Sequence, residues 1–383
     1  SARSRLNIQP SRLGPSAGRA RAAGARGASP TAMAWSTALL VLLAALVPPA
    51  AALTDCTDVL AGGVSPGRIW RHSSEYIGNC SNKWHNLKPL LRPCQAEVGY
   101  AWVQRKYDKD FDDDDEAQDE MDGSPIPAVL GPVPDDDDDG GGGSHGAALY
   151  IVDHHHTLAA LDFSGFDDVS VTVSIICDQR GLSYDAFASF MEDGALAFLL
   201  AHPSASADAQ YEPISFSALP PRFSFTASDS SFADDPWRSL SSFSRKVEND
   251  GCAAAGYGDA CLRCYDRACD TQGGGIPFFE FRWAYFFVDA LGDASLWPDK
   301  ASYENFSEAY KGLDAAAAMG SIDVDGWQAV AGLLVPLCRD AAAGEYELPE
   351  DAFAGGGGLP GYAEGFAMLD DDPDCAAPDG CGR

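Results

Sequence analysis

The segment that most restricts the fold of this chain changes from a strand pattern to a helix pattern within a few residues. Residues 148–152 are short and apolar, which is typical of a buried strand, and residues 157–161 have the composition of a helix. Four polar residues stand between the two, namely Asp153, His154, His155 and His156. A strand that runs directly into a helix indicates a core shared by both kinds of element.

Several other segments extend this mixture of strands and helices. Residues 169–175 alternate apolar and polar side chains, which predicts a half-buried strand. Asp235 followed by Pro236 is a helix start signal, and residues 278–291 carry an apolar helical stripe. We also expect strands at 126–130 and 197–201, and helices at 95–106, 184–192, 303–313 and 327–337. The pattern predicts an α+β fold with a small mixed sheet and helical additions toward the C-terminus.

The charge balance restricts the partners of the chain. It has 57 acidic residues against 26 Lys and Arg, a formal net charge of −31. Two runs rich in Asp, at 110–120 and 135–144, are expected to be solvated loops. Proteins that bind nucleic acid gain most of their affinity by neutralising phosphates with Lys and Arg, so stable binding of duplex DNA is not expected.

The N-terminal region has the pattern of a targeting segment. Residues 1–32 are rich in Arg and are expected to be a disordered leader, and Met33 opens a second segment with an apolar run at 38–47. That run is about half of the ~20 residues that span a bilayer, so residues 33–52 are interpreted as a signal peptide. No mature membrane span is expected. The chain is predicted to enter the secretory pathway and to be secreted or lumenal.

Eleven cysteines and two glycosylation sequons agree with that route. Cys56 and Cys80 are expected to form a disulfide, and Cys177, in an apolar run, is expected to be a buried free thiol. The cysteines within 252–269 have spacing that fits zinc, although disulfides are the stronger interpretation in a secreted chain. Asn79 and Asn305 each begin an Asn-x-Ser sequon.

The polar residues after the strand at 148–152 have the chemistry of a phosphate or metal site. A helix N-terminus favours a bound anion, and a neutral imidazole can accept a proton or bind a metal. Three consecutive side chains project in different directions, so we expect His155 and His156, with Asp153, to carry the chemistry. One alternative remains open, in which one histidine caps the helix and another packs inside.

Two further residues are candidates from other parts of the chain. Arg238 is placed to fork onto a phosphate, or to form a salt bridge with Asp234 or Asp235. Glu280 stands among apolar residues at a helix start, where it either binds a ligand or pairs with Arg238 or Arg282. A divalent metal held by Asp153, His155 and His156 is the cofactor that this pattern allows.

The motifs also match a known family in their order along the chain. The series resembles the putative ParB-like nuclease family, a branch of the ParB/sulfiredoxin fold. The resemblance implies that a nucleotide or another phosphorylated ligand binds at the turn before His156, with Gln95 and Thr157 as further ligand-binding residues. The family pattern Asp-Gly-His-His is altered here, because His154 replaces the glycine. The motifs that carry the resemblance are Leu91-Arg92-Pro93-Cys94-Gln95, Val98-Gly99, the segment 127–131, Asp153-His154-His155-His156, Asp234-Asp235-Pro236-Trp237-Arg238-Ser239-Leu240, Phe279-Glu280-Phe281-Arg282-Trp283 and Leu359-Pro360-Gly361-Tyr362.

Three functions fit these observations. The first is a ParB-like nuclease or nucleotide phosphohydrolase in which Asp153, His155 and His156 are catalytic. The second is a secreted domain that binds a nucleotide or phosphate ligand without turnover. The third is a secreted structural glycoprotein on a decayed scaffold, which His154 and the strong negative charge keep open. The expected organisation is a leader at 1–32, a signal peptide at 33–52, a cysteine-containing lead-in at 53–87, a ParB/sulfiredoxin-like domain at 88–300, a helical extension at 301–365 and a tail at 366–383.

Overall fold

The computed structural model describes several segments of the chain in detail. The chain divides into two compact units, Ser1–Ala52 and Leu53–Arg383, and every described residue belongs to the second unit. The expected leader and signal peptide therefore lie outside the described residues. The described segments are 54–62, 78–133, 146–202, 211–244, 279–315, 317–339, 347–348 and 357–358.

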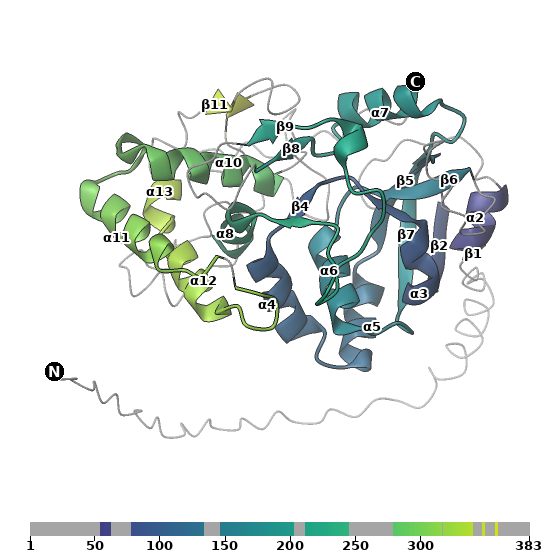
Figure 1. The fold of residues 1–383 in the computed structure, drawn as a ribbon, viewed down its shortest axis with the longest axis horizontal. Helices are drawn as coiled ribbons and strands as arrows, with labels where there is room; N and C mark the ends of the chain where they lie inside the picture. The colour runs from purple at the N-terminus through teal and green to yellow at the C-terminus, as the bar shows by residue number, and fades with distance from the viewer. Residues whose placement is uncertain are drawn as a thin grey trace, which may run out of the picture. The chain divides into compact units, whose positions relative to one another are not determined.

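A six-stranded mixed sheet forms one half of the described structure (Figure 1). Its order is β1-β2-β7-β5-β6-β3, with parallel pairs β1–β2, β5–β7 and β3–β6 and antiparallel pairs β2–β7 and β5–β6. The central strand β5 is buried along its whole length, because helices cover both faces of the sheet. The strands are β1 (Thr54–Asp55), β2 (Gly78–Lys83), β3 (Leu91–Pro93), β5 (Ile126–Pro132), β6 (Ala147–Ile151) and β7 (Ser170–Asp178).

The two faces of the sheet pack against different helices. Ala128 and Leu130 of β5 join a core that includes Leu158 and Leu161 of α6, whereas Val129 between them faces Phe187 of α7. This alternation is the period of two that a strand imposes on its side chains. The helices around the sheet are α2 (Cys56–Gly62), α3 (Trp84–Leu87), η2 (Lys88–Leu90), α4 (Tyr100–Asp110), α5 (Asp114–Gly123), α6 (His155–Ser164), α7 (Tyr184–Asp193) and η3 (Phe216–Ala218).

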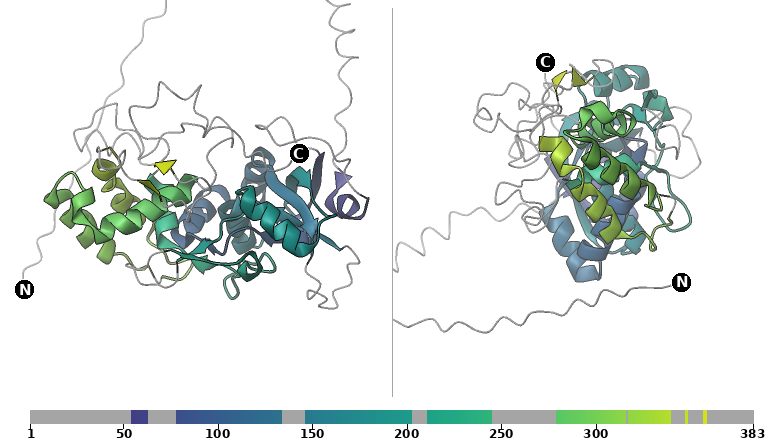
Figure 2. Two further views of the ribbon diagram at one scale, coloured as in Figure 1. Left: turned by 90° about the horizontal axis from the view of Figure 1, so that it is seen from above. Right: turned by 90° about the vertical axis from the view of Figure 1, so that its left-hand side faces the viewer.

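A group of helices with its own aromatic core packs beside the sheet half. Trp237, Trp283, Phe286 and Phe287 are fully buried in this core, and Trp102 of α4 joins it from the sheet side. Figure 2 shows these helices grouped at one end of the unit and the sheet at the other. The helices are α8 (Pro236–Ser244), α10 (Phe279–Gly292), η5 (Ala294–Leu296), α11 (Lys300–Lys311), α12 (Val324–Gly332) and α13 (Val335–Arg339).

Short two-stranded pairings connect the loops. The parallel pair β4–β10 links the segment before α4 to the segment before α8. This link fixes the start of α8 against the start of α4, and it brings two distant motifs together. The short strands are β4 (Glu97–Val98), β8 (Leu200–Ala201), β9 (Glu212–Pro213), β10 (Ala233–Asp234), β11 (Glu347–Leu348) and β12 (Gly357–Gly358).

The architecture confirms the predicted fold class, an α+β domain with a small mixed sheet and C-terminal helices. The expected strands at 126–130 and 169–175, and the expected helices at 184–192 and 278–291, are present as β5, β7, α7 and α10. The sheet also includes β1 and β2 from the lead-in segment, which pair with each other and with β7. No helix among the described residues meets the length and hydropathy that crossing a membrane requires.

Three expectations about local structure were wrong. The acidic run at 110–120 is not a loop: most of it lies in α5, where Asp113 caps the helix by accepting from the amides of Asp115 and Glu116 at 3.0 and 2.9 Å. The expected helix at 95–106 starts only at Tyr100, because Glu97 and Val98 form β4. The expected strand at 197–201 is reduced to β8. Nearly all of the second acidic run lies outside the described residues.

The cysteines confirm one expectation and correct another. Cys56 and Cys80 form the predicted disulfide, which joins the start of α2 to β2. Cys177 is not a free thiol, because it is disulfide-bonded, as is Cys338. Among the described residues, the free cysteine is the buried Cys94. The cysteines at 252–269 lie outside the described residues.

Candidate functional site

The turn between β6 and α6 has a strained backbone at His154. Asp153 is exposed, and its Oδ1 accepts a hydrogen bond from the amide of His154 at 2.6 Å. His154 has φ 65° and ψ 19°, which is the left-handed region. A non-glycine residue pays about 1 kcal/mol or more for this conformation, whereas glycine adopts it freely. The backbone conformation at this position therefore suits a glycine, which is the residue that the Asp-Gly-His-His pattern has there.

His155 and His156 turn inward from the start of α6 and bind backbone amides. The amide of Cys94 donates to Nε2 of His155 at 3.2 Å, and the amide of Gly99 donates to Nε2 of His156 at 3.1 Å. A nitrogen that accepts from an N–H carries no proton, so each neutral ring has its proton on Nδ1. In the described part of the chain, the hydrogen bonds leave both Nδ1 atoms without a partner.

Burial keeps both rings neutral. The residues are only 3% and 6% exposed, and burial is the main cause that lowers the pKa of His155 to about 3. The positive charge of Arg238 lowers it further. The pKa of His156 is also well below its usual value, first through burial and then through Arg238. The two histidines therefore offer Nδ1–H donors at neutral pH, and an incoming proton is strongly disfavoured.

Arg238 comes to this site from the first turn of α8. Asp235 accepts from the amides of Trp237 and Arg238 at 2.9 and 3.1 Å, which caps the helix as the Asp-Pro pair predicts. The guanidinium lies 4.0 Å from the centre of the Phe281 ring and forms an ion pair with Glu280. The pairing with Arg238 that was one alternative for Glu280 is therefore observed, whereas the bond between Asp235 and Arg238 uses the backbone amide of Arg238.

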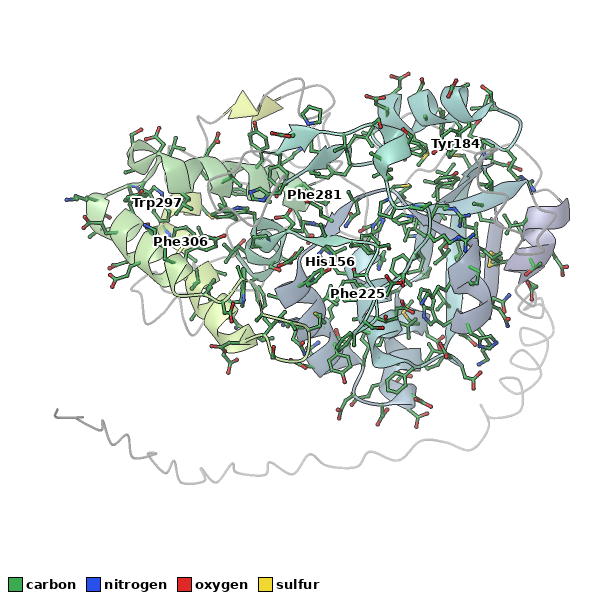
Figure 3. All side chains as sticks on the ribbon, viewed as in Figure 1. His156, Tyr184, Phe225, Phe281, Trp297 and Phe306 are labelled. Carbon is green, nitrogen blue, oxygen red and sulfur yellow. A yellow bond between two sulfur atoms is a disulfide. The ribbon has the colours of Figure 1, made fainter. Side chains whose placement is uncertain are left out.

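The segment around Gly99 packs tightly against α8. The amide of Tyr100 donates to Asp234 Oδ1 at 2.7 Å, and Ser239 Oγ accepts from the amide of Trp102 at 3.2 Å. A Cβ on Gly99 would lie 2.4 Å from Ser239 Oγ, so a larger residue would push α8 away. Four motifs that lie far apart in the sequence, around residues 95, 154, 237 and 281, thus meet at the start of α6. Figure 3 labels His156 and Phe281 in this interior region.

The remaining predicted residues lie at different depths. Gln95 is buried and donates from Nε2 to the carbonyl of Glu97 at 2.6 Å, which holds the 94–99 segment in shape. Thr157 is buried in the first turn of α6. Asp153 differs from His155 and His156, because its side chain is exposed while theirs are enclosed.

The sequence did not indicate that Glu97, Asp234 and Asp235 form a group of buried acids. Burial and the nearby charge of Asp235 raise the pKa of Glu97 to about 9, and burial raises the pKa of Asp234 to about 7. Asp235 is fully buried, and its Oδ2 accepts from the hydroxyl of Tyr211 at 2.6 Å. The one signal in the sequence was an acid within an apolar context, as at Ala96-Glu97-Val98.

His202 belongs to the same group. Its amide donates to Oε2 of Glu97 at 2.8 Å, and its ring meets the ring of Tyr211 edge to face at 5.5 Å. The apolar residues before it, Leu199, Leu200 and Ala201, marked a polar side chain at the end of a buried segment.

The residues do not fit the divalent metal that the sequence allowed. Among the described residues, no group of three His, Cys, Asp or Glu side chains is placed to hold a metal ion. At the expected site, both Nε2 atoms already accept from backbone amides, and Asp153 faces solvent. The structure therefore does not bring Asp153, His155 and His156 together as metal ligands.

The asparagine of each sequon is exposed. Asn79 is exposed in β2, and Asn305 is exposed in α11. Ser307, the third residue of the second sequon, is buried.

Comparisons with known proteins identify the domain. Residues 87–256 match the family model described as Putative ParB-like nuclease. The chain is also similar to the crystal structure of protein Atu1540 from Agrobacterium tumefaciens, with a TM-score of 0.36, 20% identity, and coverage of 66% of this chain and 91% of that one. No curated protein sequence matches. Residues 87–256 are therefore similar to the family described as Putative ParB-like nuclease.

Proposed function

We propose that this chain binds a phosphorylated ligand, such as a nucleotide, at the N-terminus of α6. The observation that carries the proposal is that His155 and His156 are neutral and accept backbone amides through Nε2, which leaves Nδ1–H to donate. Donors at a helix N-terminus favour an anion, because the backbone amides of the first turn have no partner within the helix.

Arg238 supplies the positive charge for such a ligand. It is close enough to both histidines to lower the pKa of each. Its present partner is Glu280, and a phosphate that approaches α6 would compete for the same guanidinium. Gln95 and Thr157 support the site from the 94–99 segment and the first turn of α6.

The binding proposal is tested by calorimetric titration of the full chain with inorganic phosphate and with a nucleoside triphosphate. We expect binding by the unaltered protein and a loss of affinity of about tenfold or more in His156→Gln. Glutamine can place its side-chain oxygen near the position of Nε2, where it accepts from the amide of Gly99, but it has no N–H at the position of Nδ1. Substitution of the exposed His85 by Gln serves as the control and should leave the affinity unchanged. Equal affinities in all three proteins would contradict the proposal.

Hydrolysis of a phosphodiester or nucleotide is the second candidate, favoured by the family match. In this version, Asp153 accepts a proton from water while His155 and His156 hold the phosphate. A direct role of either histidine as general base would require its Nε2 to release a backbone amide first. An assay on bis(4-nitrophenyl) phosphate tests this: turnover that disappears in Asp153→Asn supports hydrolysis, and binding without turnover supports the first candidate.

The charge of the protein argues against duplex DNA as the ligand. With a net charge of −31, the chain as a whole repels a polyanion, and the cationic side chain at the site is paired with Glu280. We therefore propose a small phosphorylated ligand.

We also propose that the chain is processed in the secretory pathway, with removal of residues 33–52. The disulfide-bonded Cys56, Cys80, Cys177 and Cys338 and the exposed Asn79 and Asn305 support this. Expression from Met33 in a eukaryotic secretory host and intact-mass analysis test it. We expect cleavage after the small residues near 50–52, and a mass decrease on treatment with a glycosidase that Asn79→Gln and Asn305→Gln abolish. A cytosolic, uncleaved product would contradict the proposal.

A further inference from the structure

His202 is a buried imidazole with unused hydrogen-bonding capacity. It is 6% exposed, and among the described residues neither Nδ1 nor Nε2 of its ring has a hydrogen-bond partner. Leaving such a group unpaired costs about 1–3 kcal/mol, and in native proteins these exceptions call for a specific explanation such as a ligand.

The polar side chains near the His202 ring differ in how many further hydrogen bonds they can form. Asp235 is satisfied, because it accepts from two α8 amides and from the Tyr211 hydroxyl. Glu97 accepts the amide of His202 through Oε2. Since its pKa is raised to about 9, Glu97 is a neutral carboxylic acid at pH 7, which also carries an O–H to donate. His202 and Glu97 together therefore offer both donors and acceptors beside the aromatic ring of Tyr211.

This polar group adjoins the α6 site. The amides of Cys94 and Gly99, which hold His155 and His156, belong to the same six-residue segment as Glu97. Arg238 connects the two places, because its charge acts on both histidines and also on Asp235 and Tyr211.

We propose that His202 and Glu97 recognise the polar heterocycle of the ligand whose phosphate binds at the start of α6, so that the ligand is a nucleoside phosphate. The inference rests on the proposed phosphate site. A nucleobase has ring donors and acceptors that match an imidazole and a carboxylic acid, and a flat face that suits an aromatic neighbour. A second anionic group is disfavoured here by Asp235, and an alkyl group would leave His202 unpaired.

The test compares ligands with and without a base on the full chain. Calorimetric titrations use inorganic phosphate, ribose 5-phosphate and the four common nucleoside 5′-monophosphates. We expect at least one nucleotide to bind about tenfold more tightly than ribose 5-phosphate, the effect of one or two well-paired hydrogen bonds. In His202→Phe this advantage should fall to about threefold or less, while the affinity for ribose 5-phosphate changes by less than about twofold.

A second variant separates recognition from damage to the fold. His202→Gln keeps a donor and an acceptor, so it should retain more of the base preference than His202→Phe at equal thermal stability. If ribose 5-phosphate binds but no nucleotide binds more tightly, or if the preference survives His202→Phe, the inference is wrong while the phosphate site stands. If neither phosphate, ribose 5-phosphate nor a nucleotide binds, both proposals are wrong.

Discussion

The two ends of helix α6 bury polar side chains in opposite ways. Near its C-terminal end, Asp162 accepts from Trp84 Nε1, from Lys88 Nζ and from the amide of Phe225, at 2.7–2.9 Å. At its N-terminal end, His155 and His156 each use one ring nitrogen. Both ends are buried, but only the N-terminal end keeps hydrogen-bonding capacity for a ligand. Burial of a polar group thus says little about function until its partners are counted.

The largest expected effect is on the satisfied end. Asp162→Ala removes the carboxylate and leaves Lys88 and the indole of Trp84 without their partner. Removing one partner of a buried ion pair costs about 3–5 kcal/mol. Since Lys88 is partly exposed, the lower end of that range is expected. Urea unfolding measures the loss, and phosphate affinity measured below the transition should be unchanged. If Asp162→Ala lost little stability but no longer bound phosphate, the C-terminal end of α6 would be the ligand-binding end, which would contradict the comparison.

The next prediction separates the two roles of His156, which accepts from the amide of Gly99 through Nε2 and is proposed to donate to phosphate through Nδ1. His156→Phe removes the acceptor of the Gly99 amide and should destabilise the fold by about 1–3 kcal/mol. His156→Gln retains an acceptor and should cost less than half as much, yet both variants should lose phosphate binding. Thermal unfolding and calorimetry of the two variants decide this. Retained phosphate binding in His156→Gln would show that Nδ1–H is not used.

A smaller effect is expected at His154. Its left-handed backbone suits glycine, so His154→Gly should relieve strain. The greater freedom of glycine in the unfolded chain offsets part of this gain. The net expectation is an increase of about 0.5 to 1 kcal/mol in the free energy of unfolding. Phosphate affinity should stay the same or rise. His154→Ala, which keeps the Cβ and removes the ring, is the matched control and should show no gain. A loss of stability in the glycine variant would mean that the His154 ring supports the turn.

The last expected effect is a dependence of stability on pH. The pKa of His155 falls from 6.5 to about 3, so the unfolded chain binds more protons and stability rises as pH increases from about 3 to 6.5. Glu97 and Asp234 have raised pKa values of about 9 and about 7, so the native state binds more protons and stability falls as pH increases from about 4 to 9. The two trends oppose each other below pH 6.5 and leave a net decline above it.

Unfolding in urea between pH 5 and 9 measures this dependence. Asp234→Asn should remove the part of the decline that lies below about pH 7, while the unaltered protein should keep it. A stability that does not fall from pH 7 to 9 would show that Glu97 is ionised in the native state.

The sequence predicted elements with local patterns and missed features that depend on tertiary contacts. The strand and helix on either side of His155 were recognisable because periodicity and apolar content are local properties. Helix α5 was not predicted, because only two of its residues, Ala117 and Met121, are buried in the core. The acidic residues around them in the sequence are typical of a solvated loop. The pairing of β4 with β10 joins two-residue strands more than 130 residues apart, and no local pattern marks such a pair.

The site was predictable in composition but not in chemistry. The motifs identified Arg238 and Glu280 as candidate site residues, and their side chains form an ion pair in the structure. The sequence did not show that the amides of Cys94 and Gly99 occupy Nε2 of the two histidines, which changes them from candidate bases to donors. That change depends on a loop that reaches α6 from about 60 residues away in the sequence.

Nitrogen-15 NMR of the histidine rings tests the central claim most directly. In the full chain at pH 7, the account predicts that His155 and His156 are neutral, with protonated Nδ1 and unprotonated Nε2, and that inorganic phosphate shifts the Nδ1 resonances of both. Assignment by His155→Gln and His156→Gln identifies the two signals. Protonated Nε2 atoms, or Nδ1 resonances that saturating phosphate leaves in place, would contradict the account.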